Sequence, residues 1–470
     1  MEPTSASSND LICAIATPPG QGGIGVIRLS GQGAKTLAET LCQRKLPPRY
    51  AVYSKLTDSD QLLDDGICLF FPGPNSFTGE DVVEIQGHGG PVVQHAILNV
   101  LCRKGARMAR PGEFSERAFL NGKLDLVQAE AIADLISAQS EAAAKAALST
   151  MTGEFSRQIN GLAERMINLR ILIEAAIDFP EEDIEILEQA DAATKIQQMS
   201  KNLEHLINVA TQGKVLNQGI SVVLVGAPNV GKSSLLNALA GEDTAIVTDV
   251  PGTTRDVLKV DLVIEGLPIQ IVDTAGLRDS DDKVERIGIE RAKEQIHKAD
   301  AVVLVMAADT LEQTRIERDV RSVMSKMKGN DPASGNASSK LFLAVNKSDL
   351  VNEENHRSSV NATFPEALPR PYQISAKTKQ GLDQLVKAVA GSVTFDQDHV
   401  PFSARQRHIQ ALEQTRKNVQ QAGDALAQGM DAEFIAEELI MAHLSLGEIV
   451  GTLSADDLLG KIFAEFCIGK

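Results

Sequence analysis

The chain has 470 residues, 43% of them hydrophobic, and a formal net charge of −17. This length predicts two or three domains with substantial hydrophobic cores. Such an acidic balance argues against non-specific coating of nucleic acid, although a local basic patch remains compatible with it. Tryptophan is absent and tyrosine occurs three times, which argues against a broad aromatic platform for stacking bases.

The cysteines and the termini indicate a compartment. Five cysteines are scattered without metal-ligand spacing, which is typical of reduced thiols in a reducing compartment. Residues 1–10 are polar and lack the apolar core of a signal peptide, and no apolar run is long enough to span a bilayer. We therefore expect a cytoplasmic protein without a membrane segment. Cys467 stands four from the end, but Gly469 and Lys470 do not suit a prenylation box.

Residues 10–120 alternate short apolar runs with Gly/Pro turns, a pattern typical of an α+β domain. The apolar runs 11–16, 26–29, 66–71 and 82–85 predict strands, and residues 33–42 and 91–105 predict helices. Residues 20–25 match the G-x-G-x-x-G pattern of dinucleotide sites. Because an apolar strand rather than a helix follows them, we interpret these glycines as a tight turn between strands.

The texture becomes helical over residues 126–215, which are rich in Ala, Glu, Gln, Ile and Leu, and again over 403–470. An α/β pattern lies between them and contains a low-complexity insertion at 328–339. We predict an α+β N-terminal domain (1–122), a helical domain in two halves (123–217 and 394–470), and an inserted α/β P-loop domain (218–393).

The inserted segment carries a complete phosphate-binding loop, G-x-x-x-x-G-K-S, at residues 226–233. An apolar run at 220–225 precedes it and a helical pattern follows it, which is the context this motif requires. Converging backbone N–H groups and the helix dipole favour phosphate. Lys232 would reach the β- and γ-phosphates, and Ser233 would hold Mg²⁺. The expected nucleotide contacts here are Asn229, Val230, Gly231, Lys232, Ser233 and Ser234.

Two further motifs name the base as guanine. Asn346, Lys347 and Asp349 follow an apolar strand, and Asp349 can accept hydrogen bonds from the N1–H and exocyclic amine of guanine. Adenine lacks this donor pair and would leave the carboxylate unpaired. The segment Ser375, Ala376 and Lys377 would offer a backbone N–H to the guanine carbonyl. The substrate is therefore expected to be GTP.

A fourth motif, Asp273–Thr274–Ala275–Gly276, would sense the γ-phosphate, with Asp273 holding Mg²⁺ through water. The next residue, Leu277, cannot orient water as the glutamine of many GTPases does. Glu285 is a candidate for that task, although the residues alone favour a solvated carboxylate at a helix start.

Asn229 and the segment 248–256 also have two readings. Thr254 suits Mg²⁺ in a switch segment. The Asn229 side-chain oxygen and nearby carbonyls could hold a monovalent cation that supplies the charge of an arginine finger, or the amide could merely stabilise the loop. Cys467, on the C-terminal tail, is either an exposed thiol or a reactive one.

Longer motifs carry a family resemblance. The segments 16–25, 87–90, 110–121, 252–256, 284–288 and 467–470 resemble the MnmE (TrmE) family of tRNA-modification GTPases, and the resemblance covers essentially the whole chain. It implies that Asn229, Thr248, Val250 and Thr253 bind K⁺ and that Glu285 positions water through a second water molecule. It also implies a candidate role for Cys467 as a nucleophile.

The resemblance further implies an N-terminal domain that dimerises the protein and binds 5-formyl-tetrahydrofolate or a related tetrahydrofolate. Arg28, Glu84 and Lys123 match its site, with Lys470 approaching it, and Glu84 is preferred over Glu80. With an FAD-containing partner, MnmG, the family modifies carbon 5 of the tRNA wobble uridine, adding an aminomethyl or carboxymethylaminomethyl group. The alternatives are a regulatory or ribosome-assembly GTPase without folate chemistry, and a dimeric scaffold with residual GTPase activity.

Overall fold

The computed structural model describes residues 10–59, 61–178, 191–240, 259–264, 267–273, 295–297, 299–327, 340–350, 364, 368–392, 402–452, 456–464, 466 and 469. The chain forms two compact units. The first comprises Met1–Ile136, Thr150–Glu204 and Gln410–Lys470, and the second comprises Ser137–Ser149 and His205–Ile409. No helix in the described ranges is both long and apolar enough to cross a membrane.

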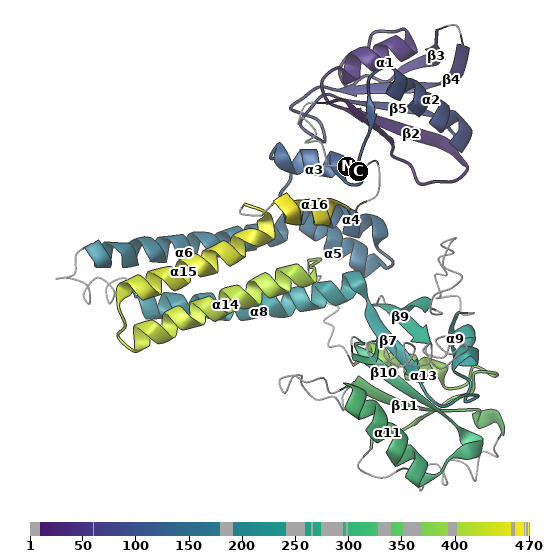
Figure 1. Ribbon diagram of the computed structural model, residues 1–470, viewed down its shortest axis with the longest axis vertical. Helices are drawn as coiled ribbons and strands as arrows, with labels where there is room; N and C mark the ends of the chain where they lie inside the picture. Colours follow the sequence, from purple (N-terminus) through teal and green to yellow (C-terminus); the bar gives the residue numbers. More distant parts are fainter. Residues whose placement is uncertain are drawn as a thin grey trace, which may run out of the picture. The chain divides into compact units, whose positions relative to one another are not determined.

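The first unit opens with a six-stranded sheet in the order β3-β4-β5-β2-β1-β6 (Figure 1). Its strands are β1 (Ile12–Ile15), β2 (Gly22–Ser30), β3 (Val52–Asp58), β4 (Gln61–Phe71), β5 (Val82–Gly89) and β6 (Arg107–Met108). Strands β2 and β5 are antiparallel neighbours although β3 and β4 separate them in sequence.

The two faces of this sheet differ. Helices α1 (Ala34–Cys42) and α2 (Pro91–Arg103) pack with the buried residues Ile27, Leu29 and Ile85 in one hydrophobic core. Because side chains alternate along a strand, Arg28 and Glu84 belong to the opposite face and are only partly buried. That face is the candidate site of the first unit.

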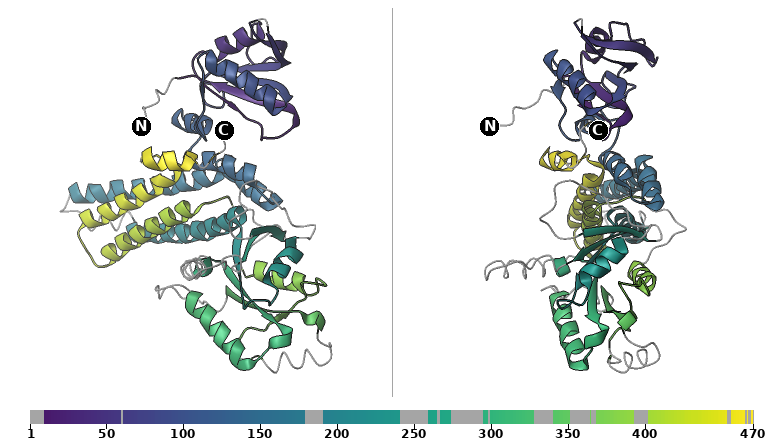
Figure 2. Two further views of the ribbon diagram at one scale, coloured as in Figure 1. Left: turned by 45° about the vertical axis from the view of Figure 1, so that its right-hand side comes forward. Right: turned by 90° about the vertical axis from the view of Figure 1, so that its right-hand side faces the viewer.

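The rest of the first unit is helical. It contains α3 (Glu113–Leu120), most of α4 (Leu126–Ser137), α6 (Glu154–Asp178), α15 (Ala432–Val450) and α16 (Asp456–Ala464). Helices α6 and α15 pack side by side, as Figures 1 and 2 show in teal and yellow. The boundary between the units falls within α8 (Ala192–Gln218) and α14 (Gln406–Ala427), and α5 (Glu141–Met151) belongs mainly to the second unit.

The second unit is built on a sheet in the order β12-β11-β10-β7-β9-β8, parallel except for β8. Its strands are β7 (Ile220–Val225), β8 (Lys259–Ile264), β9 (Leu267–Asp273), β10 (Ala301–Ala307), β11 (Leu341–Asn346) and β12 (Tyr372–Gln373). After β7, the chain forms β8 and β9 on one side of that strand. It then crosses over to form β10, β11 and β12 on the other side. This reversal is the topological switch point at which α/β sheets bind ligands.

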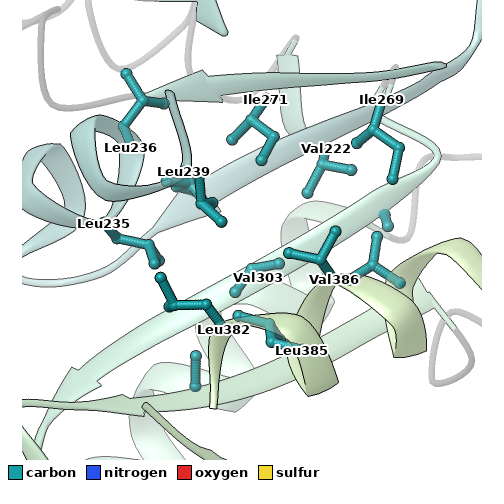
Figure 3. Close-up of a cluster of buried hydrophobic side chains, with 14 of the residues drawn as sticks. Val222, Leu235, Leu236, Leu239, Ile269, Ile271, Val303, Leu382, Leu385 and Val386 are labelled. Carbon is teal, nitrogen blue, oxygen red and sulfur yellow. The ribbon is translucent and has the colours of Figure 1, made fainter. Parts of the chain in front are cut away.

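Both faces of this sheet are covered, which explains why its central strands are continuously apolar. Helices α9 (Lys232–Ala240) and α13 (Leu382–Ala390) bury Leu235 and Leu385 against Val222 on one face (Figure 3). Helix α11 (Gln313–Met327) buries Val320 against Val223 on the other. Short 3₁₀ turns at Ala308–Thr310 and Ser348–Leu350 follow β10 and β11.

The predicted fold class is confirmed in its three parts: an α+β N-terminal sheet domain, a helical part and an α/β P-loop part. The predicted domain boundaries stay predictions, and the insertion at 328–339 lies outside the described residues. One local interpretation needs correction. Residues 16–21 form the connection after β1, whereas Gly22–Gly25 begin β2 itself. Glycine is required opposite that place, because a Cβ at Gly89 of β5 would lie 2.4 Å from the Gly22 carbonyl oxygen.

Candidate functional site

The phosphate-binding loop occupies the turn between β7 and α9, and α9 begins at Lys232. Nζ of Lys232 donates hydrogen bonds to the carbonyl oxygens of Gly226 and Ala227, at 2.9 and 3.0 Å. Asn229 and Gly231 have φ of 64° and 93°, left-handed conformations that let the chain curl over the helix N-terminus. The loop therefore has the strand, curl and helix start that suit an anion.

Asn346, at the end of β11, joins the phosphate loop to the 375–377 segment. Its Nδ2 donates to the Val230 carbonyl oxygen at 3.0 Å, and its Oδ1 accepts from the backbone N–H of Ala376 at 3.0 Å. The side chain is 2% exposed, so both bonds form away from solvent. A Cβ at Gly231 would lie 2.3 Å from Asn346 Nδ2, which means that this contact requires glycine.

Asp349 lies three residues beyond Asn346 on an exposed turn. Ser375 Oγ donates to Asp349 Oδ1 at 2.7 Å and accepts from the backbone N–H of Thr378 at 3.1 Å. The hydrogen bond from Ser375 is the main cause that lowers the pKa of the Asp349 carboxyl, and a backbone hydrogen bond and the positive charge of Lys377 act in the same direction. Asp349 is thereby held as an oriented carboxylate that can accept the paired donors of guanine.

Only some of the other residues predicted to bind the nucleotide lie within the described structure. Lys347, Ser233 and Ser234 are described, and Lys347 Nζ lies 3.4 Å from Asp309 Oδ2. Asp273 ends β9, beside Leu224 of β7 in register, and its side chain is not among the described ones. The residues that lie outside the described structure are Thr248, Val250, Thr253, Thr254, Thr274, Ala275, Gly276 and Glu285.

On the N-terminal sheet, Arg28 and Glu84 face each other across β2 and β5. Arg28 Nε and Nη2 both donate to Glu84 Oε1, at 3.1 and 2.8 Å. The guanidinium carbon lies 5.4 Å from the Phe77 ring centroid and 5.8 Å from that of Phe114. The cation is therefore held between two aromatic rings and a carboxylate.

Lys123 follows α3 and is exposed, and its backbone N–H donates to the Ala118 carbonyl at 2.8 Å. A Cβ at Gly79 would lie 3.4 Å from Lys123 Cγ, so the Lys123 stem borders the turn that also carries Phe77. The structure thus brings Arg28, Glu84 and Lys123 to the same end of the sheet's open face.

The C-terminal tail reaches this site as well. Arg28 Nη1 donates to the Gly469 carbonyl oxygen at 3.5 Å. Gly469 has a φ of 96°, and a Cβ there would lie 2.4 Å from the Ile15 carbonyl oxygen. Phe463 and Phe466 anchor the preceding helix against Gly112 at the start of α3. Cys467 and Lys470 lie outside the described residues.

Sequence reasoning missed the aromatic residues around Arg28. It also missed the neighbouring group of charged side chains in which Arg117 pairs with Glu80. Phe114 stood within a motif segment, but no local pattern pairs it with Arg28. Glu80 accepts from Arg117 and Ser30 rather than from Arg28. The preference for Glu84 over Glu80 as a folate-site residue stays a prediction.

Solved structures resemble parts of the chain. The G domain of the T. maritima FeoB iron transporter is 23% identical, covers 37% of this chain and 99% of its own, and has a TM-score of 0.26. An Aquifex aeolicus Era variant bound to GDP·AlF4⁻ is 26% identical, covers 42% of this chain and 66% of its own, and has a TM-score of 0.28. The FeoB G-domain from Methanococcus jannaschii is 24% identical over 37% of this chain and 96% of its own, with a TM-score of 0.25.

Two family models match the chain. The N-terminal model of the GTP-binding protein TrmE matches residues 11–123. The model of the MnmE helical domain matches residues 126–467, a span that encloses the P-loop segment.

Proposed function

The chain belongs to the MnmE family, also called TrmE, and from this premise we propose that it is a K⁺-activated GTP hydrolase that acts in tRNA wobble-uridine modification. The observation that carries the GTP part is the Asn346 side chain, which ties the phosphate loop to the segment that orients Asp349. A protein that bound any nucleoside triphosphate would not need this link between phosphate and base recognition.

Each nucleotide role falls to a residue type that suits it. Lys232 exchanges its two carbonyl partners for the β- and γ-phosphates, and its burial strengthens that contact. Ser233, with Thr254 and water held by Asp273, carries Mg²⁺. Asn229, Thr248, Val250 and Thr253 hold K⁺, which offsets transition-state charge, and Glu285 positions the attacking water.

GTP hydrolysis in K⁺ and in Na⁺ at equal ionic strength tests this part. We expect strong stimulation by K⁺, and an Asn229→Ala variant should lose it while retaining nucleotide binding. Equal wild-type rates in both salts would reject the cation site and favour a conventional GTPase switch. Thermal melting of the variant serves as the control for folding.

The N-terminal site is assigned to a tetrahydrofolate such as 5-formyl-tetrahydrofolate. Glu84 Oε1 is used by Arg28, whereas Oε2 accepts from no donor among the described residues. That free oxygen suits the amino and ring N–H donors of a pterin, and the cations Lys123 and Lys470 suit the anionic tail of a folate. When bound, the folate supplies a one-carbon unit.

The remaining roles follow from the family. The protein works as a cytoplasmic homodimer with FAD-containing MnmG, and Cys467 is a candidate group for uridine activation. The net charge of −17 favours tRNA contact that rests largely with the partner. Mass spectrometry of tRNA from a deletion strain tests this. Loss of the wobble modification, restored by the wild-type gene, is expected. An unchanged level of the wobble modification, together with a defect in ribosomal subunits, would favour the ribosome-assembly alternative.

A further inference from the structure

The turn between β4 and β5, residues 72–81, lies against two of the three cations of the proposed folate site, Arg28 and Lys123. Its Phe77 ring lies 5.4 Å from the Arg28 guanidinium carbon. Its Gly79 borders Lys123, and Asn121 Nδ2 donates to the Thr78 carbonyl oxygen at 2.7 Å. The position of this turn therefore decides what surrounds Arg28 and Lys123.

One carboxylate fixes the turn from below. Glu80 Oε2 accepts from Arg117 Nη1 at 3.0 Å and from Ser30 Oγ at 2.7 Å, and Oε1 accepts from Arg117 at 3.3 Å. Ser30 and Thr78 are fully buried, and their hydroxyl oxygens lie 2.7 Å apart. Both oxygens of Glu80 are thus engaged by the protein, unlike those of Glu84.

Glu80 is not required to neutralise the arginines of this cluster. Arg117 also donates to Asp10 at 2.7 Å and to Glu113 at 3.2 Å, and Arg107 pairs with the same two carboxylates. Two arginines already balance two carboxylates without Glu80. Its ion pair therefore connects the turn to a group of charges that is held together without it. The buried Arg117 and the partly exposed Arg107 both keep carboxylate partners when Glu80 is changed.

We propose that Glu80 is a positioning residue for the folate site, which acts through the 72–81 turn by holding Phe77 over Arg28. This inference rests on the proposed folate function. Glu84 contacts the ligand, whereas Glu80 touches only protein groups. Glu80 and Glu84, four positions apart, thus have separate roles.

The test measures the Kd of 5-formyl-tetrahydrofolate by calorimetry on the full-length protein. Glu80→Gln keeps the shape but loses a charge-assisted bond, so we expect about tenfold weaker binding. Thr78→Val removes one buried hydroxyl and should weaken binding in the same direction. Glu116→Gln is the matched control, because Glu116 pairs with Arg110 at 2.9 Å and makes no described bond to the turn. Its Kd should stay within twofold of the wild type.

A double-mutant cycle separates positioning from direct contact and from general damage. If Glu80 acts through Phe77, Glu80→Gln should have little further effect in a Phe77→Leu background. Additive losses would show that Glu80 acts independently of Phe77 and would overturn the inference, as would an unchanged Kd in Glu80→Gln. A wild-type protein that binds no folate would overturn both the inference and the folate site. Equal melting temperatures across the variants verify that each is folded.

Discussion

His88, near the end of β5, shows how one exposed side chain is tuned by its neighbour. Its Nδ1 lies 2.6 Å from Asp64 Oδ1, and its backbone N–H donates to Asp64 Oδ2 at 2.8 Å. The hydrogen bond to Asp64 raises the pKa of the His88 imidazole above its usual 6.5, with attraction to the same carboxylate adding to it. The charged form is favoured because the acceptor is itself ionised.

We predict that Asp64→Asn lowers the pKa of His88 towards 6.5, as measured by NMR titration of the imidazole. Because the folded-state pKa is raised, the pair's stabilisation is fully present below pH 6.5 and is lost as pH rises through the folded-state value. The control is Asp58→Asn, which removes a carboxylate that pairs with Arg103 and Lys104 and should leave the His88 titration unchanged. An unmoved His88 titration would contradict the pairing.

At the nucleotide site, we predict that Asn346→Ala weakens GDP binding about a hundredfold, because it breaks two buried hydrogen bonds and leaves partners unsatisfied. Binding is measured with a fluorescent guanine nucleotide. Asn237→Ala, at an exposed position of α9, is the matched control and should bind normally. A small effect of Asn346→Ala would mean that the two loops are held together by other contacts.

At the scale of elements, tertiary packing competes with helix propensity. Gly161 lies in α6 and Gly213 in α8, both in helix interiors where alanine is intrinsically better by about 1 kcal/mol. A Cβ at Gly161 would meet only Arg165 Nη1, at 3.8 Å. A Cβ at Gly213 would lie 1.9 Å from the Phe402 carbonyl oxygen. A Gly→Ala substitution would therefore enter open space at Gly161 and clash with backbone at Gly213.

We predict that Gly161→Ala stabilises the protein by about 0.5–1 kcal/mol and that Gly213→Ala destabilises it by about 1–3 kcal/mol. The difference appears as opposite shifts of the urea midpoint. If both variants were stabilised, the close approach of α8 to the segment before α14 would be wrong. The measurement compares the cost of a close backbone contact with the gain in helix propensity. The helical pattern of the sequence alone cannot give this comparison.

Helices and strands could be predicted from the sequence where the buried residues are also the apolar ones. The apolar runs of β7 and β11, which are buried on both faces of the sheet, were predicted as strands, whereas β3 was missed. In β3, Tyr53 is exposed and Ser54 is buried, with its hydroxyl donating to the Cys42 carbonyl oxygen at 2.6 Å. The apolar alternation is thus inverted. Arg28 and Glu84 were placed in one site only by family resemblance, because β3 and β4 intervene between β2 and β5 in the sequence and local patterns do not reveal strand order.

At the scale of the molecule, two compact units carry two proposed ligand sites. The first unit has a hydrophobic core beneath the N-terminal sheet. The second unit has a hydrophobic cluster on each face of the P-loop sheet. The proposed guanine nucleotide contacts lie in the second unit, and Arg28, Glu84 and Lys123 lie in the first. Separate cores favour separate unfolding transitions, since cooperativity requires shared buried contacts.

We therefore predict at least two calorimetric transitions, each sensitive to one ligand. A ligand that binds only the folded state at a hundred times its Kd adds about 2.7 kcal/mol of stability, enough to move one transition by several degrees. GDP with Mg²⁺ should raise only the transition of the P-loop unit, and 5-formyl-tetrahydrofolate should raise only the other. Glu84→Gln should abolish the folate shift and retain the GDP shift, whereas Asn346→Ala should do the reverse. A single transition raised by both ligands would show that α8 and α14, which span the unit boundary, join the two cores into one cooperative structure.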